Sequence, residues 1–253
     1  MAIARRVDRN GDTGLGSGVT SFSEVIPEMA RWRRRRLAYT LEEIMKHVEL
    51  FARDPIVIQT ENGTYTPMIS AQVVRAIIGV TGFAGLRLGE IRGLWWDDDR
   101  GDVLAICRSM WRSTLKNTKT EEDVDDPGLV PVIQPLRWLL DAVKPNDAVG
   151  FIFPNRVGGA LDLDNLADRV IKPTLEAHGL VWKGWHAYRR GLATNLKELG
   201  VSDTTIQWIL RHEDVSTTQR FYIKTAPKVA HDAMRKLEEK IACTAVVQQT
   251  AVN

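Results

Sequence analysis

The sequence has few cysteines and no long apolar run. Only Cys107 and Cys243 occur among its 253 residues, far apart and without the spacing of metal ligands. This excludes a disulfide-stapled fold and a cysteine zinc site, and it favours a reduced, intracellular protein. No stretch approaches the ~20 apolar residues of a membrane helix, and no apolar segment typical of a secretory signal follows the N-terminus. We therefore expect a cytoplasmic protein that does not contact a membrane.

A strong excess of one charge is also missing. The formal net charge is +2, with 44% hydrophobic and 26% charged residues, which is ordinary for a globular protein. So small a sum is weak evidence for a nucleic-acid partner, because the local distribution of charge matters more. Five arginines nevertheless surround Trp32 in one block: Arg31, Arg33, Arg34, Arg35 and Arg36. Such a block can neutralise DNA phosphates, and a solvated linker explains it equally well.

The apolar periodicity predicts a mainly α-helical chain with a small antiparallel β-sheet, an α+β fold. Ser and Thr residues in capping positions mark several helix starts, and Gly200 marks a helix end. The predicted helices cover residues 41–52, 73–80, 88–94, 135–143, 163–178, 186–199, 202–210 and 227–241. Extended runs are expected at 56–58, 103–107, 109–115 and 129–133, with a turn at Asn62-Gly63.

Arginines, histidines and a tyrosine carry the chemical signal. Arg87 stands on a glycine-rich bend, His186 and Arg189 are three residues apart on one helix, and His212 and Tyr222 follow. An arginine offers a planar fork that matches phosphate oxygens in pairs. A histidine transfers protons near neutral pH, and a tyrosine hydroxyl can form a covalent intermediate. This set of residues indicates an attack on a phosphodiester without a metal.

Each motif also has an ordinary structural explanation. Arg87 and Glu90 can be a simple surface pair worth about a few tenths of a kcal/mol. The spacing of His186 and Arg189 is common in helices, and His212 can be a capping residue whose charged form the helix dipole favours. Lys119, at an expected hairpin turn, can reach a DNA groove or protonate a leaving oxygen, or it can simply be solvated, and Lys116 is a rival for that role.

Taken together and in this order, the motifs resemble the catalytic domain of the tyrosine recombinases of the phage-integrase family, over residues 38–235. The resemblance rests on five segments: 81–95 with Arg87, 117–120 with Lys119 followed by Val130-Pro131, 186–189 with His186 and Arg189, 210–218 with His212, and 221–224 with Tyr222. In the fourth segment Arg211 stands where the family usually has glycine.

The resemblance implies an organisation for the chain. Residues 1–37 would be a basic, partly disordered lead-in or interdomain linker, residues 38–242 the catalytic domain and residues 243–253 a frayed tail. Because this lead-in is short and has no periodicity, we expect the chain to lack the DNA-clamping domain that family members carry ahead of the catalytic one. The implied partners are double-stranded DNA and further copies of the chain, in a tetramer, with no small-molecule substrate.

The resemblance also implies a mechanism. Tyr222 would attack a DNA phosphate to form a 3′-phosphotyrosyl link, with Arg87 and Arg189 clamping the phosphate oxygens. The other expected participants are Lys119 as the donor to the leaving 5′ oxygen, His186 and His212 as proton-transfer groups, and Glu90 as a support for Arg87. The phosphotyrosyl link keeps the bond energy, so neither a metal nor another cofactor is expected.

Two departures keep other functions open. Phe221 stands at the family's usual distance from the second histidine, and Tyr222 comes one residue later, a shift of about 100° on a helix. An acidic run, 121–126, follows Lys119. The alternatives are a catalytically dead, DNA-binding integrase remnant and a type IB topoisomerase that relaxes DNA. A histidine-ligated metal hydrolase is a poor alternative, because His186 and His212 lack a third ligand at helical spacing.

Overall fold

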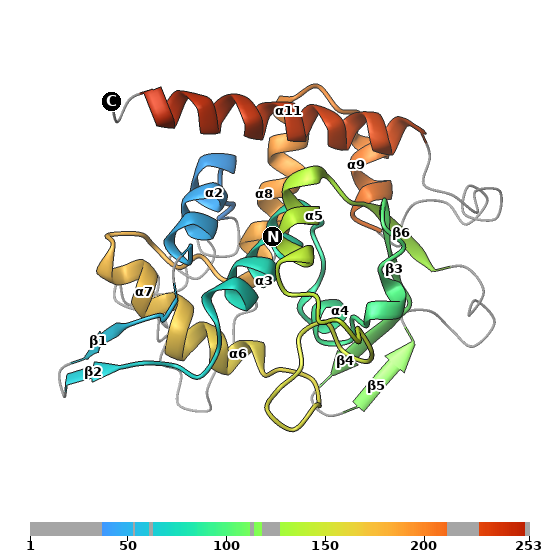
Figure 1. Ribbon diagram of the computed structural model, residues 1–253. Helices are drawn as coiled ribbons and strands as arrows, with labels where there is room; N and C mark the ends of the chain where they lie inside the picture. The colour runs from blue at the N-terminus through green and yellow to red at the C-terminus, as the bar shows by residue number, and fades with distance from the viewer. Residues whose placement is uncertain are drawn as a thin grey trace, which may run out of the picture. The chain divides into compact units, whose positions relative to one another are not determined.

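The computed structural model describes residues 37–52, 54–60, 63–111, 114–117, 127–211 and 228–250, without the side chains of 60, 116, 117 and 245–250 (Figure 1). The described residues belong to one unit, Leu37–Asn253, which combines helices with pairs of short antiparallel strands. The predicted α+β class is therefore confirmed. Lys119, His212, Tyr222 and the basic block at 31–36 lie outside the described residues.

Local capping signals set the helix starts as predicted. Helix α2 (Leu41–Leu50) begins with a capping box in which Thr40 Oγ1 accepts from the Glu43 N–H at 3.2 Å and Glu43 Oε2 accepts from the Thr40 N–H at 2.8 Å. Ser70 Oγ accepts from the Val73 N–H and starts α3 (Ala71–Phe83). Ser202 caps α9 (Asp203–Ile209) in the same way.

The other helices keep the predicted order. They are α4 (Leu88–Arg92), the 3₁₀ turn η1 (Trp96–Asp98), α5 (Gln134–Asp141), α6 (Leu163–Leu166), the π turn η3 (Ala167–Ile171), α7 (Lys172–Ala177), α8 (Trp185–Glu198) and α11 (Lys228–Thr250). The single helix expected over 163–178 is therefore interrupted by a π turn. Pro173 lies just after that turn and has no N–H to donate to the preceding turn, which is a sufficient physical reason for the altered bonding.

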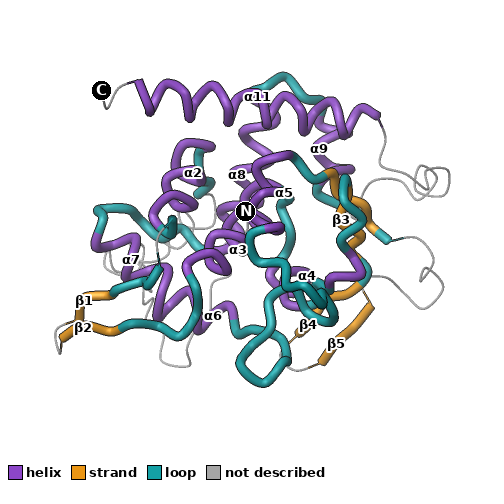
Figure 2. Tube along the Cα trace, viewed as in Figure 1, coloured by secondary structure: helices purple, strands orange, loops and turns teal. Residues whose placement is uncertain are grey.

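The strands of the described segments form three antiparallel pairs rather than one sheet (Figure 2). They are β1 (Ile58–Thr60) with β2 (Gly63–Tyr65), β3 (Val103–Ile106) with β6 (Gly128–Pro131), and β4 (Arg108–Trp111) with β5 (Thr114–Asn117). The run expected to be extended over 109–115 is in fact the two arms of a hairpin, because Trp111 pairs with Thr114. Lys119 comes after this hairpin, in the connection from β5 to β6.

Helix α3 lies at the centre of the core. Its residues from Ala76 to Phe83 are all buried, and it packs against α2, α5 and α8. Helix α11 runs along one side of the unit, across α8 and α9 (Figure 1). It is longer than the predicted 227–241, and its buried residues recur at helical spacing: Ala230, Ala233, Met234, Leu237 and Ile241. Among the described helices none is long and apolar enough to cross a membrane.

Helix α8 is seated against the segment that precedes α2. The Tyr39 N–H donates to Ala187 O at 3.2 Å, and the backbone of Tyr39 lies directly over Gly191. A Cβ on Gly191 would overlap the Tyr39 carbonyl oxygen and stand 3.2 Å from the Tyr39 backbone nitrogen. Because the obstacle is backbone, no side-chain rotation can relieve it. The glycine therefore sets how closely α8 approaches the start of the unit.

We expect Gly191→Ala to destabilise the protein, by about 1–3 kcal/mol or more, as overpacking does. In an unobstructed helix the same change stabilises by about 1 kcal/mol, so the sign of the effect is the test. Gly79→Ala in α3 is the comparison, because the nearest atom there is the terminal Cδ1 of Leu139, at 2.5 Å, which can rotate away. Urea unfolding measures both variants, and a Gly191→Ala protein as stable as the native one would contradict the close approach.

Candidate functional site

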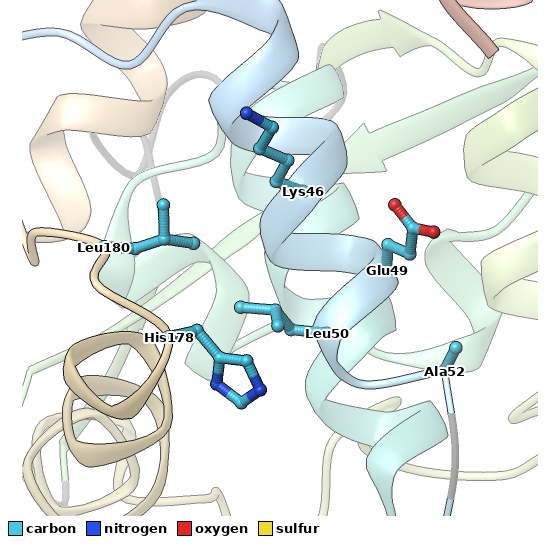
Figure 3. Close-up of a pocket in the computed structure, with 6 residues that line it drawn as sticks. All are labelled: Lys46, Glu49, Leu50, Ala52, His178 and Leu180. Atoms are coloured by element: carbon cyan, nitrogen blue, oxygen red, sulfur yellow. The ribbon is translucent and has the colours of Figure 1, made fainter. Parts of the chain in front are cut away.

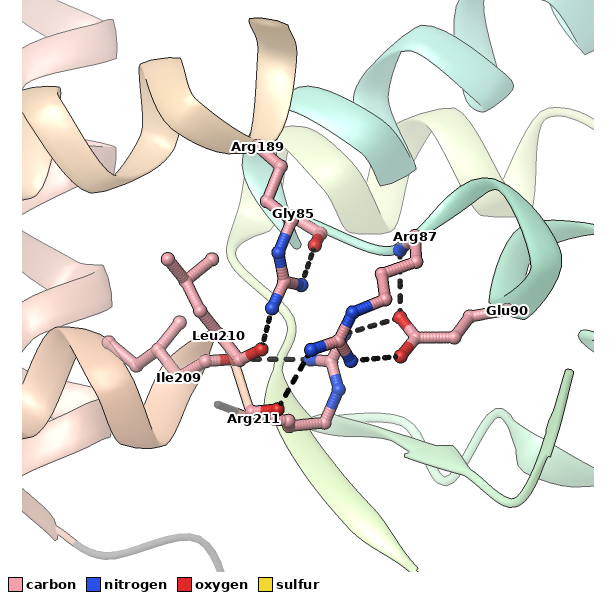
Figure 4. A network of polar contacts seen from close by, with 7 residues as sticks. All are labelled: Gly85, Arg87, Glu90, Arg189, Ile209, Leu210 and Arg211. Carbon is pink, nitrogen blue, oxygen red and sulfur yellow. Dashed lines mark hydrogen bonds and ion pairs between the residues drawn. The ribbon is translucent and has the colours of Figure 1, made fainter. Parts of the chain in front are cut away.

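Three segments distant in the sequence meet around the guanidinium of Arg189, which projects from α8 (Figure 4). One of its amino groups donates to Gly85 O, in the bend before α4, and the other donates to Leu210 O, at the end of α9. Arg189 is buried, with 7% of its surface exposed. A single buried side chain thus holds the α3–α4 bend against the end of α9.

Gly85 makes this meeting sterically feasible. Its φ of +62° lies in the left-handed region, which glycine adopts without a steric penalty. A Cβ there would stand 2.7 Å from Leu210 Cδ2 and 2.9 Å from Leu192 Cδ2. The glycine-rich bend expected around Arg87 is therefore confirmed at Gly85, where both the backbone conformation and the tight packing require the absence of a side chain.

Arg87 is the N-cap residue of α4, and Glu90 holds it in place. Arg87 Nη1 donates to Glu90 Oε1 at 2.9 Å, and the Arg87 backbone N–H donates to Glu90 Oε2 at 2.7 Å. Arg87 Nη2 donates to the carbonyl oxygen of Arg211 at 3.2 Å. The Arg87 side chain is 41% exposed while that of Glu90 is 5% exposed. The contact with Glu90 thus orients a guanidinium that solvent, or an anion, can still reach.

The sequence analysis assigned no role to Arg211, yet its side chain belongs to this cluster. Arg211 Nη2 donates to Glu90 Oε2 at 2.7 Å, so Glu90 lies between two guanidinium groups (Figure 4). Its φ is +53°, which is uncommon for a residue other than glycine. The one signal in the sequence was an arginine at a position where a helix commonly ends in glycine.

The cluster holds more positive than negative charge. Burial by itself would raise the pKa of Glu90, but Arg211, the Arg87 N–H, the Arg87 guanidinium and Arg189 together hold that pKa below its usual value. Burial, with the charges of Arg211 and Arg87, lowers the pKa of Arg189 to about 9, so the group stays protonated at neutral pH. Three cations around one carboxylate leave a surplus of positive charge, which suits the binding of an anion.

His186 lies one helical turn before Arg189, on the same face of α8, and its side chain is exposed. Partial burial and the positive charges of Arg190, Arg189 and Arg87 lower its pKa below the usual value of 6.5. At neutral pH the imidazole is therefore mostly neutral. In that form one ring nitrogen donates a hydrogen bond, and the other can accept a hydrogen bond or a proton.

The described structure thus brings together Arg87, Glu90, Arg189 and His186. His212 follows Arg211 directly in the chain but lies outside the described residues, as do Lys119, Tyr222 and the arginine block at 31–36. A pocket of about 610 Å³ opens elsewhere, between α2 and the segment after α7, and none of the predicted site residues lines it (Figure 3). Its lining residues are Lys46, Glu49, Leu50, Ala52, His178 and Leu180.

Comparison with known proteins identifies the family and the fold of this chain. Residues 66–228 match the model of the phage integrase family, which is more than half of the chain, and the chain belongs to this family of tyrosine recombinases. Over 182 residues it is 27% identical to a tyrosine recombinase XerC-like protein of Caldanaerobacter subterraneus subsp. tengcongensis. That alignment covers 61% of this chain and 46% of the relative, so the chain matches about half the length of that curated protein.

Solved structures share the fold. The Tn1549 transposon integrase, in complex with transposon right end DNA, superimposes with a TM-score of 0.55 and 20% identity, over 81% of this chain and 66% of that one. The XerA recombinase superimposes with a TM-score of 0.50 and 17% identity, over 81% and 65% of the two chains. The recognition of a tyrosine recombinase catalytic fold from the order of the motifs is therefore confirmed.

We expect Glu90→Gln to destabilise the folded protein by about 3 kcal/mol at neutral pH, because it leaves buried guanidinium groups without their counter-charge. The folded-state pKa of Glu90 is below its reference value of 4.5. The stabilisation is therefore fully present above about pH 4.5 and is lost as the pH falls through the folded-state pKa. Urea unfolding of both proteins at about pH 7 and about pH 3.5 measures the difference and its loss.

Glu239→Gln is the control for this prediction, because Glu239 is 65% exposed and its nearest cation, Arg235, is 4.0 Å away. A surface change of this kind is expected to alter stability by no more than about 0.5 kcal/mol. Equal effects of the two substitutions at neutral pH, or an effect of Glu90→Gln that does not change with pH, would show that Glu90 is not the counter-charge of the cluster.

Proposed function

We propose that this chain cuts and rejoins double-stranded DNA through a 3′-phosphotyrosyl intermediate at Tyr222. The observation that carries the proposal is the meeting of Arg87 and Arg189, which come from distant parts of the sequence. They donate to the consecutive carbonyls of Arg211 and Leu210, immediately before His212. Two guanidinium groups at one place, one of them solvent-accessible, can bind the two non-bridging oxygens of one phosphate.

In this proposal Arg87 and Arg189 stabilise the charge that develops on the phosphate. The transition state of phosphoryl transfer spreads negative charge over the equatorial oxygens, so donors already fixed in position act most strongly there. Arg189 is fixed by two backbone carbonyls, and Arg87 by Glu90. Little reorganisation is then needed when the phosphate is attacked.

The remaining steps involve His186 and residues outside the described part of the chain. The Tyr222 oxygen attacks the phosphorus in line, a P–O bond forms, and the bond to the 5′ oxygen breaks. The phenolic proton passes to His186 or His212, and Lys119 gives a proton to the 5′ oxygen as it leaves. The 5′-hydroxyl of a second strand then reverses these steps, so the phosphodiester is restored without an outside energy source.

The relatives' names support DNA as the partner. The XerC-like relative is named a tyrosine recombinase, and the Tn1549 integrase was solved in complex with transposon DNA.

We also propose that the chain assembles on DNA as a tetramer. Helix α11 is a candidate for packing between protomers, although its apolar face is buried against α8 and α9 of its own chain. Sedimentation of the DNA complex measures the number of protomers.

We expect the native chain to become covalently attached to a nicked suicide DNA substrate, and Tyr222→Phe to abolish the adduct by removing the nucleophile. Denaturing gel electrophoresis of the mixture detects the attached DNA. Phe221→Leu is the matched control, because it changes the neighbouring side chain and leaves the phenol in place. An adduct that persists in Tyr222→Phe would show that another group attacks the phosphate.

The same assay separates the alternatives. Phe221 stands at the usual nucleophile spacing, so an adduct formed only by the Phe221→Tyr variant would identify the native chain as a DNA-binding remnant. DNA binding without any adduct, from native protein of confirmed fold, leads to the same conclusion. Relaxation of supercoiled DNA without added partner DNA, in the absence of strand exchange, would instead indicate a topoisomerase.

A further inference from the structure

Arg211 has a backbone conformation that normally selects glycine. It follows Leu210, the C-cap of α9, and its φ of +53° places it in the left-handed region. Glycine is the usual residue at this position after a helix, because a Cβ is strained there. Among the described residues Arg211 is the only one other than glycine with a positive φ. A residue that keeps such a conformation is a candidate for a role that its side chain performs.

Arg211 contacts Arg87 through its backbone carbonyl and contacts Glu90, the carboxylate that holds Arg87, through its side chain. Its Nη2 donates to Glu90 Oε2 at 2.7 Å, and its own carbonyl oxygen accepts from Arg87 Nη2 at 3.2 Å. Its Nη1 donates to Ile209 O at 3.1 Å, and the side chain is 11% exposed. Arg211 is therefore well placed to control the geometry of Arg87.

Gly128, at the start of β6, provides the space that this side chain needs. A Cβ on Gly128 would overlap Arg211 Cδ and stand 3.3 Å from Arg211 Cγ. Gly128 does not have a φ in the left-handed region, so its backbone does not require glycine. The three nearest atoms that a Cβ would meet all belong to the Arg211 side chain. The absence of a side chain at 128 is thus explained by the presence of one at 211.

The chemistry of the carboxylate shows what Arg211 achieves. A carboxylate with both oxygens available tends to bind one guanidinium through two parallel hydrogen bonds. Here Glu90 Oε2 is taken by Arg211 and by the Arg87 backbone N–H, which leaves Oε1 for the Arg87 side chain. Of the five N–H donors of a guanidinium, those of Arg87 make two described bonds, one to Glu90 and one to Arg211 O. The remaining donors have no partner among the residues that the structure describes, and we infer that they bind the phosphate.

We propose that Arg211 is a positioning residue that occupies one oxygen of Glu90 and so keeps the donors of Arg87 directed at the scissile phosphate. It also adds a third positive charge beside Arg87 and Arg189. The inference rests on the proposed strand cleavage. It assigns a role in that reaction to a residue that takes no part in the nucleophilic attack or the proton transfers.

Arg211→Gly is the first test, because glycine suits the backbone conformation while the guanidinium is lost. We expect Tm to change by no more than about 2–4 °C, since strain relief and loss of the ion pair oppose each other. The rate of adduct formation on the suicide substrate, with DNA saturating, should fall by roughly tenfold to a hundredfold, as for one lost hydrogen bond to a charged group. Arg211→Lys, which keeps the charge, should recover part of the rate.

Gly128→Ala is the second test, and it leaves the guanidinium in the protein. In the native background the added methyl group displaces the Arg211 side chain from Glu90, and the cleavage rate should fall. In the Arg211→Gly background there is no side chain to displace, so Gly128→Ala should have no further effect. Effects that multiply in the double variant, or native cleavage rates in Arg211→Gly, would overturn the positioning role.

A readout that does not involve DNA separates this inference from the proposed function. Among the described residues, the charged groups that act on Glu90 are Arg211, Arg87 and Arg189. Loss of Arg211 should raise the pH at which the Glu90 carboxyl carbon titrates by NMR, and an unchanged titration would show that the contact is absent. If the native chain forms no adduct but Glu90 responds in this way, strand cleavage is refuted while the Arg211–Glu90 contact stands.

Discussion

The site depends on the interaction of the Glu90 carboxylate with the guanidinium groups around it. Three guanidinium groups repel one another, and they share one place only because a buried negative charge lies among them. Glu90 also receives the backbone N–H of Arg87, so the same carboxylate that balances the charges fixes the start of α4. The arrangement leaves the cluster positive overall, with one arginine, Arg87, open to a ligand.

The fold positions these arginines because backbone segments approach one another closely at two glycines. Gly85 lets the α3–α4 bend reach Leu210, and Gly191 lets α8 lie against the backbone of Tyr39. Arg189 then joins the bend to the end of α9 through two carbonyl oxygens. Because the core is close-packed, these contacts hold the arginines in one geometry. The rigidity that the proposed electrostatic stabilisation requires is therefore a property of the packing around the site.

Elements with strong local signals were predicted well from the sequence. Thr40, Ser70 and Ser202 start their helices as expected, because a cap is a contact between residues two or three positions apart. The run at 109–115 was predicted as one extended segment, and it is instead a hairpin whose strands pair with each other. Strand pairing depends on contacts between segments, which the alternation of residue types does not reveal. The pairing partners of β3, β4 and β6 could therefore be identified only from the structure.

The sequence by itself determined the family, because the order and spacing of the motifs can be recognised without knowledge of the fold. It also predicted the types of the reactive groups. It indicated that Arg87 lies beside Glu90 and that His186 lies beside Arg189, because the members of each pair are three residues apart on a helix. Only the tertiary structure decided that the two pairs meet, and that Arg211 joins them. That convergence depends on long-range packing at Gly85 and Gly128, where the missing side chain makes room for an element far away in the sequence.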